Sequence, residues 1–152
     1  MVRAIMLLSL ISLPSFAGDN SLTITTKGTG TTITAKQVGN GNSSHILCGA
    51  NSSGSMPGTT YASHTCGSAT LNTTVIGHSN TTRLYTVWSN NIDNNYTISI
   101  TGDDNFAWLD QDEDDNTSTI TQTGDDNHAE QLGSGDDNAY SITQTGNDKY
   151  AK

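Results

Sequence analysis

The residues best placed to do chemistry in this sequence are pairs of aspartates that return at regular spacing. A Gly-Asp-Asp-Asn tetrapeptide occurs at 102–105, 124–127 and 135–138, and weaker copies occur at 113–116 and 146–149. Two neighbouring carboxylates can share acid and base roles in catalysis, or they can bind a divalent cation. A catalytic pair is normally singular, whereas paired carboxylates recur here from turn to turn, so the repetition favours a structural role in turns.

The acidic turns leave two interpretations open. Thirteen acidic residues and no lysine or arginine lie between Asn94 and Asp148. Their charge could discourage premature growth of a β-sheet, or the turns could bind divalent cations weakly. The first interpretation is favoured, because the spacing of eleven residues differs from the roughly nine-residue repeat of calcium-binding solenoids.

The other polar residues do not suggest a reaction centre. The four histidines, His45, His64, His78 and His128, share no spacing typical of metal ligands. The sequence shows no glycine-rich phosphate loop, nucleophile elbow or catalytic triad in a known order. We therefore expect neither enzymatic activity nor a metal or other cofactor.

Cys48 and Cys66 are the only cysteines in the chain. An exported protein meets an oxidising compartment, where cysteine pairs of this kind form disulfides. Such a bridge would either staple an inserted loop, contributing about 3 kcal/mol through loop-closure entropy, or act as a redox-sensitive trigger. Stapling requires most of residues 49–65 to lie outside any regular repeat.

Residues 1–17 are predicted to be a signal peptide. Arg3 precedes an apolar run from Ala4 to Leu13, and Ser15-Phe16-Ala17 places small residues where signal peptidase reads them. No later stretch approaches the ~20 apolar residues of a transmembrane helix, so we expect no membrane insertion. A net charge of -9 argues against nucleic-acid binding, because phosphates require lysine and arginine.

An eleven-residue repeat organises the rest of the chain. Asparagines recur every eleven residues at positions 94, 105, 116, 127 and 138. Counted from each asparagine, the odd places carry the larger or more buriable side chains, and the even places are mostly polar, with many threonines. This period of two predicts a strand of about seven residues, and the Gly-Asp-Asp segment after it predicts a turn.

Stacking of these units predicts an all-β fold, a β-solenoid (β-helix) of about five two-strand rungs. One strand and turn cannot bury its apolar places alone, but successive rungs stacked at about 4.8 Å can. The register extends upstream to Asn20, fails in an irregular insert at about 49–68, and is interrupted by three further residues before Asn94. The alternative is a disordered Asn/Thr/Gly-rich tract, which would need no register.

The inward places define the expected core. Stacked glutamines and asparagines can hydrogen-bond to the copies above and below, which offsets the cost of burying an amide. Leu109 is expected to point inward, and Thr119 and Thr121 outward. The expected repeat core comprises Gln37, Asn42, Ile98, Asn105, Ala107, Gln111, Asn116, Ile120, Gln122, Asn127, Ala129, Asn138, Ile142 and Gln144, with Gly102, Gly124, Gly135 and Gly146 in the turns.

This pattern resembles the curlin family, the subunits of curli-type bacterial amyloid fibres, whose repeat carries Gln-x-Gly-x-x-Asn-x-Ala. Residues 144–151 match that motif except for Lys149 in the asparagine place, and residues 100–107 match except for Ile100 in the glutamine place. The cysteines depart from the family pattern. The full match is formed by Gln122, Gly124, Asn127 and Ala129.

The resemblance implies an exported β-solenoid subunit that polymerises into extracellular fibres at the cell surface, for adhesion and biofilm matrix. It implies a homopolymer, with a second curlin-type subunit and an outer-membrane secretion pore as partners. Two alternatives remain open. A threonine-rich outer face could bind ice, or a monomeric solenoid with capped ends could serve as an adhesin.

The acidic turns also predict a dependence of assembly on pH. Aspartates 103/104, 125/126 and 148 should stack on one edge of the solenoid, and 114/115 and 136/137 on the other. Carboxylates about 4.8 Å apart repel one another, which should raise their pKa values in the folded state. Assembly is therefore expected to be slow near neutral pH and faster in mild acid or added salt.

Overall fold

The computed structural model describes residues 7–8, 18–49, 66–86 and 93–152, and no helix occurs among them. The predicted signal peptide and insert therefore fall largely outside the described residues. No helix in the described ranges is long and apolar enough to span a membrane. The strands are β1 (Leu7–Leu8), β2 (Ser21–Thr26), β3 (Thr32–Val38), β4 (Ser43–Cys48), β5 (Thr70–Ile76), β6 (Thr81–Thr86), β7 (Asn95–Thr101), β8 (Phe106–Gln111), β9 (Thr117–Thr123), β10 (His128–Gly133), β11 (Ala139–Thr145) and β12 (Tyr150–Ala151).

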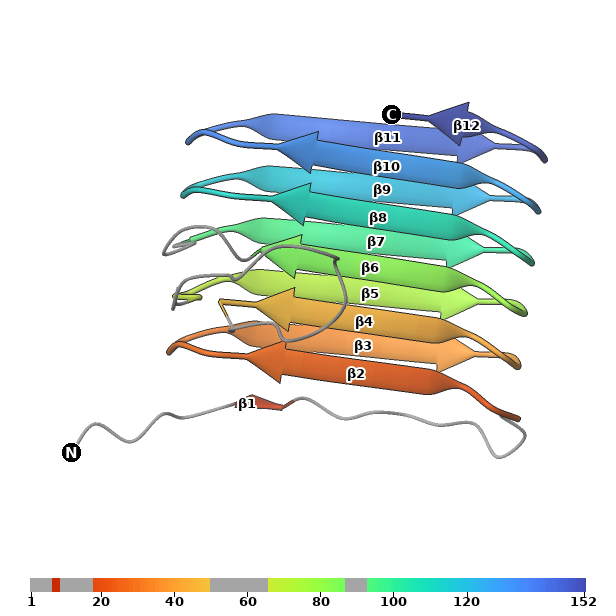
Figure 1. Ribbon diagram of the computed structural model, residues 1–152, viewed down its shortest axis with the longest axis horizontal. Helices are drawn as coiled ribbons and strands as arrows, with labels where there is room; N and C mark the ends of the chain where they lie inside the picture. The colour runs from red at the N-terminus through yellow and green to blue at the C-terminus, as the bar shows by residue number, and fades with distance from the viewer. Residues whose placement is uncertain (1–6, 9–17, 50–65, 87–92) are drawn as a thin grey trace, which may run out of the picture.

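Two parallel sheets form the walls of the molecule. Sheet A has the order β1-β3-β5-β7-β9-β11, and sheet B has the order β12-β10-β8-β6-β4-β2. From β2 onward the chain alternates between the sheets, so each turn of the chain adds one strand to each sheet (Figure 1). The all-β prediction is confirmed, because this arrangement is a β-solenoid of about five two-strand rungs.

The register between rungs survives two insertions. Hydrogen-bonded asparagines are 22 residues apart from Asn105 to Asn127. They are 38 residues apart from Asn42 to Asn80 and 25 apart from Asn80 to Asn105, an excess of 16 and 3 residues. Nevertheless β4, β6 and β8 pair in parallel without a slip, with Ile46 opposite Leu84 and Leu84 opposite Leu109. The extra residues therefore do not shift the pairing of these strands.

The core lies between the two sheets and is filled by alternate residues of each strand. In β7 and β9 the second, fourth and sixth residues are buried and the others are not. Because a strand directs successive side chains to opposite faces, this alternation separates the interior from the two outer faces. The largest fully buried side chains include Tyr96, Ile46, Leu71, Leu84 and Ile98.

The turns depend on left-handed backbone conformations. Asp104, Asp126 and Asp148 have φ values of 54°, 56° and 56°, and Asp115 and Asp137 have φ values of 56° and 58°. Aspartate tolerates this conformation better than most residues, because its short side chain can hydrogen-bond locally. The second aspartate of each Gly-Asp-Asp-Asn segment is thus selected by backbone geometry as well as by charge.

Candidate functional site

One edge of the solenoid carries a continuous ladder of asparagine side chains. The backbone N–H of each asparagine donates to the side-chain oxygen of the asparagine one rung earlier. The N–H···Oδ1 pairs are Asn42 to Asn20 at 2.8 Å, Asn80 to Asn42 at 3.1 Å, Asn105 to Asn80 at 2.9 Å, Asn127 to Asn105 at 3.0 Å and Lys149 to Asn127 at 3.0 Å. Lys149 occupies the asparagine place through its backbone alone.

The amide nitrogens of the same ladder bind the turns of the next rung. Asn105 Nδ2 donates to the Gly124 carbonyl and Asn127 Nδ2 to the Gly146 carbonyl, each at 2.7 Å. A Cβ built on Gly102 would overlap the carbonyl oxygen of Gly124, and one on Gly124 would overlap that of Gly146. Glycine is therefore required here because successive turns approach too closely for a side chain, as well as for its positive φ.

The opposite edge has the same ladder only in its later rungs. Asn116 N–H donates to Asn94 Oδ1 at 2.7 Å, and Asn138 N–H donates to Asn116 Oδ1 at 2.9 Å. In the two earlier rungs the equivalent places hold Thr31 and Ala69, whose pairing follows from the bond between Thr32 N–H and the Ala69 carbonyl at 2.8 Å. This edge therefore lacks ladder amides at Thr31 and Ala69.

A disulfide between Cys48 and Cys66 lies at the edge where the asparagines are missing. Both cysteines are fully buried. Cys66 N–H donates to the Lys27 carbonyl at 2.7 Å, and Ser68 N–H donates to the Thr29 carbonyl at 3.1 Å. The chain therefore returns to the stacking register directly at Cys66, and residues 50–65 lie outside the described structure.

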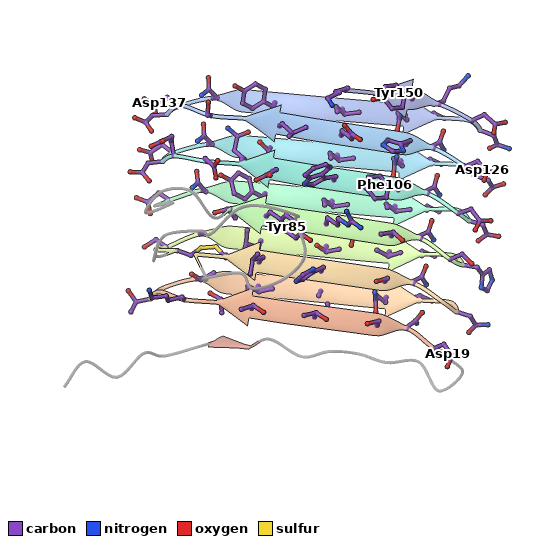
Figure 2. The ribbon with its side chains drawn as sticks, viewed as in Figure 1. Asp19, Tyr85, Phe106, Asp126, Asp137 and Tyr150 are labelled. Carbon is purple, nitrogen blue, oxygen red and sulfur yellow. A yellow bond between two sulfur atoms is a disulfide. The ribbon has the colours of Figure 1, made fainter. Side chains whose placement is uncertain are left out.

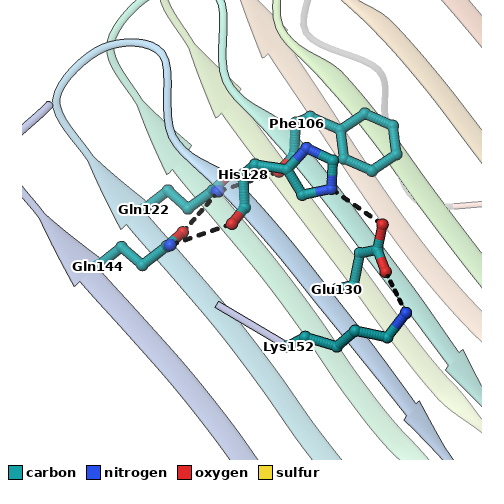
Figure 3. A network of polar contacts seen from close by, with 6 residues as sticks. All are labelled: Phe106, Gln122, His128, Glu130, Gln144 and Lys152. Carbon is teal, nitrogen blue, oxygen red and sulfur yellow. Dashed lines mark hydrogen bonds and ion pairs between the residues drawn. The ribbon is translucent and has the colours of Figure 1, made fainter. Parts of the chain in front are cut away.

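The glutamines form a shorter network than the expected stack. Gln122 Nε2 donates to Gln144 Oε1 at 2.9 Å and to the Phe106 carbonyl at 3.0 Å, and Gln144 Nε2 donates to the His128 carbonyl at 3.0 Å (Figure 3). Ile100 lies directly below Gln122 and ends the stack. The buried Gln122 Oε1 has no hydrogen-bond partner.

Gln111 and Gln37 lie apart from that pair. Gln111 belongs to sheet B, and its Oε1 accepts a bond from Ser118 Oγ at 3.2 Å across the core. Gly133 lies beside it on β10 and leaves the room that the Gln111 amide occupies. Gln37 Nε2 bonds to Ser44 Oγ at 2.9 Å and to the Ser21 carbonyl at 3.0 Å.

The expected core residues are buried with two exceptions. Asn138 and Ile142 are half-buried, because β11 is the last strand of its sheet. Thr119 and Thr121 lie on the outer face of sheet A, partly exposed. The turn glycines have φ values of 129° at Gly102, 114° at Gly124, 98° at Gly135 and 100° at Gly146. The buried set is Gln37, Asn42, Ile98, Asn105, Ala107, Leu109, Gln111, Asn116, Ile120, Gln122, Asn127, Ala129 and Gln144.

The first aspartate of each turn has a structural bond that the sequence did not predict. Asp103 Oδ1 accepts the His78 N–H at 2.7 Å, Asp125 Oδ1 accepts the Asp103 N–H at 2.9 Å, and Asn147 Oδ1 accepts the Asp125 N–H at 2.9 Å. At the other edge, Asp136 Oδ1 accepts the Asp114 N–H at 3.0 Å. The presence of Asn147 in this series is the sequence signal that an oxygen, and not a charge, is required.

The acidic turns stack on two opposite edges of the molecule. Backbone bonds from Asp126 to Asp103 and from Asp137 to Asp114 place the turns directly above one another. Figure 2 shows Asp126 and Asp137 at opposite ends of the rungs. Desolvation, together with the charges of Asp137 and Asp93, raises the pKa of the Asp115 carboxyl. No group of three or more histidine, cysteine or acidic residues in the described ranges could hold a metal ion.

The outer face of sheet A is nearly uncharged and rich in hydroxyl groups. We call it the threonine face, defined as the outward residues of β3, β5, β7, β9 and β11. Lys36 is the only charged side chain on it. Its two central columns contain Thr34, Asn72, Thr97, Thr119 and Ser141, and Lys36, Thr74, Ser99, Thr121 and Thr143.

The outer face of sheet B carries aromatic and charged side chains instead. The His128 ring lies between Phe106 and Tyr150, with centroid distances of 4.6 Å and 5.1 Å. The Arg83 guanidinium lies 5.5 Å from the Phe106 ring centroid. The spacing of 22 residues from Phe106 to His128 and from His128 to Tyr150 could have revealed this ladder from the sequence.

Two acidic residues on this outer face have shifted pKa values. Glu130 bonds to Lys152 Nζ at 2.9 Å and to His128 Nε2 at 3.0 Å (Figure 3), and these two partners lower the pKa of its carboxyl. Burial, followed by the charge of Asp112, raises the pKa of the Asp110 carboxyl to about 7.

The fold and its ladders define a two-sheet β-solenoid in which polar side chains bind one rung to the next. Residues 102–130 match the family model described as the curlin associated repeat. The match confirms the resemblance over the segment that contains β8, β9 and the start of β10. Comparisons with curated proteins and with solved structures found no match.

Proposed function

We propose that this chain is an extracellular structural subunit that self-assembles into curli-like amyloid fibres, for surface adhesion and biofilm matrix. The proposal is supported by the curlin associated repeat at 102–130 and by the stacking geometry. Its role in the fibre is mechanical, with no catalytic step and no cofactor. A second curlin-type subunit and an outer-membrane secretion pore are proposed partners.

The observation that carries the proposal is the repetition of the bonds between rungs. Asn105 binds Asn80 behind it and Gly124 ahead of it, and Asn127 repeats this arrangement toward Asn105 and Gly146. Within one copy this ladder ends at Lys149, whose side chain has no oxygen to accept the next N–H. The parallel strand edges, however, leave N–H and C=O groups that a further strand can pair with. A rung from another copy can therefore continue both sheets.

The mechanism proposed is stacking of copies along the solenoid axis. The rungs of successive copies would continue both sheets at a spacing of about 4.8 Å, as in other cross-β assemblies. Each added copy would extend the backbone hydrogen-bond ladders of both sheets at the junction. Growth would then be favoured by the same hydrogen bonds that hold one copy together.

The test is assembly of the purified chain, without residues 1–17, alone and with added preformed fibre fragments. Thioflavin binding, electron microscopy and fibre diffraction would report a fibre with a meridional spacing of about 4.8 Å. A variant carrying Asn105→Ala serves as the comparison, because it interrupts the ladder in mid-chain. If the parent chain remains monomeric for days at high concentration, even with fragments, the proposal is wrong.

A further inference from the structure

The threonine face differs from every other large surface of the described structure in its lack of charge. Outward residues of β3, β5, β7, β9 and β11 include Lys36 as their single charged group, although the chain has a net charge of -9. The strands pair in strict register, so Thr97 lies beside Asn72 on one side and Thr119 on the other. The face is consequently regular, and no strand of the described residues packs on its outer side.

Covering the threonine face costs little in desolvation. Hydroxyl groups on facing strands can pair with each other, and threonine methyl groups add apolar area. The outer face of sheet B carries Arg83 and the ion pair of Glu130 with Lys152, and removing water from charged groups is expensive even when they are paired. Of the two outer faces, only that of sheet A is suited to close contact with another flat sheet.

The threonine face is large enough for a specific contact. It is built from five strands of seven residues each. At about 4.8 Å between strands and about 3.3 Å per residue, it covers roughly 550 Å². Two such faces together would bury about 1,100 Å², which is above the roughly 1,000 Å² expected of a specific interface.

We infer that the threonine face is a lateral interface between two copies of this chain, which pack sheet A against sheet A. This inference rests on the proposed function, because fibre growth joins many such faces into one continuous strip. Within a fibre the contact would repeat about every 24 Å, so a weak pairwise contact becomes strong through multivalency.

The charge of the acidic turns makes this contact depend on the salt concentration. Both edges of the threonine face are bordered by aspartates, including Asp126 on one edge and Asp137 on the other (Figure 2). Two sheets packed about 10 Å apart bring these columns within one or two screening lengths of their counterparts. Lateral pairing should therefore strengthen as salt is added, whereas a contact between opposite charges would weaken.

The deciding experiment compares two single lysine substitutions. Thr97→Lys places a charge at the centre of the threonine face, on β7, and Thr81→Lys places the same charge on the outer face of sheet B, on β6. Both threonines are half-buried and point outward. Mass per length of the fibres is measured by scanning transmission electron microscopy for the parent and for each variant.

The expected result is a twofold fall in mass per length for Thr97→Lys and no change for Thr81→Lys. Equal mass per length in all three fibres, or a parent fibre of one copy per about 24 Å, would overturn the lateral interface and leave the proposed function intact. Absence of fibres from the parent chain would instead contradict the proposed function.

Crosslinking gives an independent readout on the same positions. Fibres of Thr97→Cys should yield covalent dimers with a bis-maleimide crosslinker that spans the roughly 10 Å between packed sheets, and fibres of Thr81→Cys should yield none. Dimers from Thr81→Cys alone would place the contact on sheet B and overturn the inference. Thermal hysteresis by the unassembled chain, if Thr97→Lys abolishes it, would show that the threonine face binds ice. Binding of the chain to insoluble polysaccharide, if Thr97→Lys abolishes it, would show that the face binds glycan. Either result would overturn self-pairing.

Discussion

The early rungs and the late rungs of this solenoid are held together by different means. From β7 onward, asparagine ladders run along both edges and acidic turns stack at both ends. Between β2 and β6 one edge has Thr31 and Ala69 in the ladder places, and the Cys48–Cys66 disulfide lies there. This edge is therefore held by repeated hydrogen bonds in the late rungs and by one covalent bond in the early rungs, while the opposite edge keeps its asparagine ladder throughout.

This difference follows from the insertion in the early rungs. Between Asn42 and Asn80 the chain carries 16 residues beyond the usual 22. Hydrogen bonds between ladder amides cannot bring the two ends of such an insertion together, because they form only between residues that already lie in register on neighbouring rungs. A disulfide acts across the insertion and returns the chain to the stack at Cys66.

The largest expected effect comes from breaking the late ladder at Asn105. Asn105→Ala removes bonds to Asn80 Oδ1 and the Gly124 carbonyl, and it leaves the Asn127 N–H without its acceptor. Unpaired buried groups of this kind cost about 1–3 kcal/mol each, so we expect a loss of about 4 kcal/mol in the free energy of unfolding. Urea denaturation followed by circular dichroism measures this change.

Asn138→Ala is the matched control for that substitution. Asn138 donates its backbone N–H to Asn116 Oδ1, a bond that alanine keeps, and its side chain is half-buried. We expect a change below about 1 kcal/mol. Equal losses from the two substitutions would show that the ladder amides do not stabilise the late rungs.

Loss of the disulfide should act mainly on the early rungs. The double substitution Cys48→Ser and Cys66→Ser removes a closed loop of seventeen intervening residues, with an expected loss of about 3 kcal/mol. Amide hydrogen exchange should quicken in β4 and β5 and remain slow in β9. Uniform acceleration across all strands would contradict the division between the two regions.

Much of this division could be read from the sequence, and some could not. The spacing of eleven predicted the strands, the turns and the solenoid, because stacking demands a constant period. Gln111, Gln122 and Gln144 were expected in the core and are buried there, but the sequence did not show that Ile100 below Gln122 limits the glutamine stack of sheet A to one pair. The backbone N–H that donates to the first aspartate of each turn was not predicted. An aspartate at this place can supply either a charge or a hydrogen-bond acceptor, and the residue type alone does not distinguish the two.

A smaller effect is expected at Asp110, on the late part of sheet B. Burial and the charge of Asp112 raise its pKa from 3.8 to about 7, while Tyr85 and Leu132 flank it on the neighbouring strands. The folded state then binds its proton more tightly, so this group lowers stability as pH rises from about 4 through about 7. Asp110→Asn should therefore stabilise the protein by about 2 kcal/mol at pH 8 and by little at pH 4.

His45, on the early part of the same sheet, should oppose this trend. Burial and the charge of Arg83 lower the pKa of its imidazole below 6.5, so it reduces stability as pH falls through that range. Thermal melts of Asp110→Asn and His45→Gln from pH 4 to pH 8 separate the two contributions. If the melting temperature of Asp110→Asn depends on pH in the same way as that of the parent chain, the charged Asp110 carboxylate does not destabilise the fold.

The smallest expected effect distinguishes charge from hydrogen bonding in the acidic turns. Asp125 Oδ1 accepts the Asp103 N–H at 2.9 Å, and Asn147 does the same for Asp125 one rung later. Asp125→Asn keeps the acceptor and removes a charge from a stacked column, so stability should be unchanged or rise by a few tenths of a kcal/mol. Asp125→Ala removes the acceptor and should cost about 1 kcal/mol.

Assembly rates of the same two variants test whether the acidic turns delay stacking. Like charges about 4.8 Å apart repel each other, and salt screens that repulsion. Asp125→Asn should therefore shorten the lag before fibre growth at neutral pH and low salt, and the difference from the parent should shrink in added salt. Asp125→Ala removes the same charge but weakens the turn, so its lag should shorten less than that of Asp125→Asn. If both variants assemble as slowly as the parent at every salt concentration, the turn at Asp125 has no electrostatic part in assembly, and its aspartate is retained for the hydrogen bond alone.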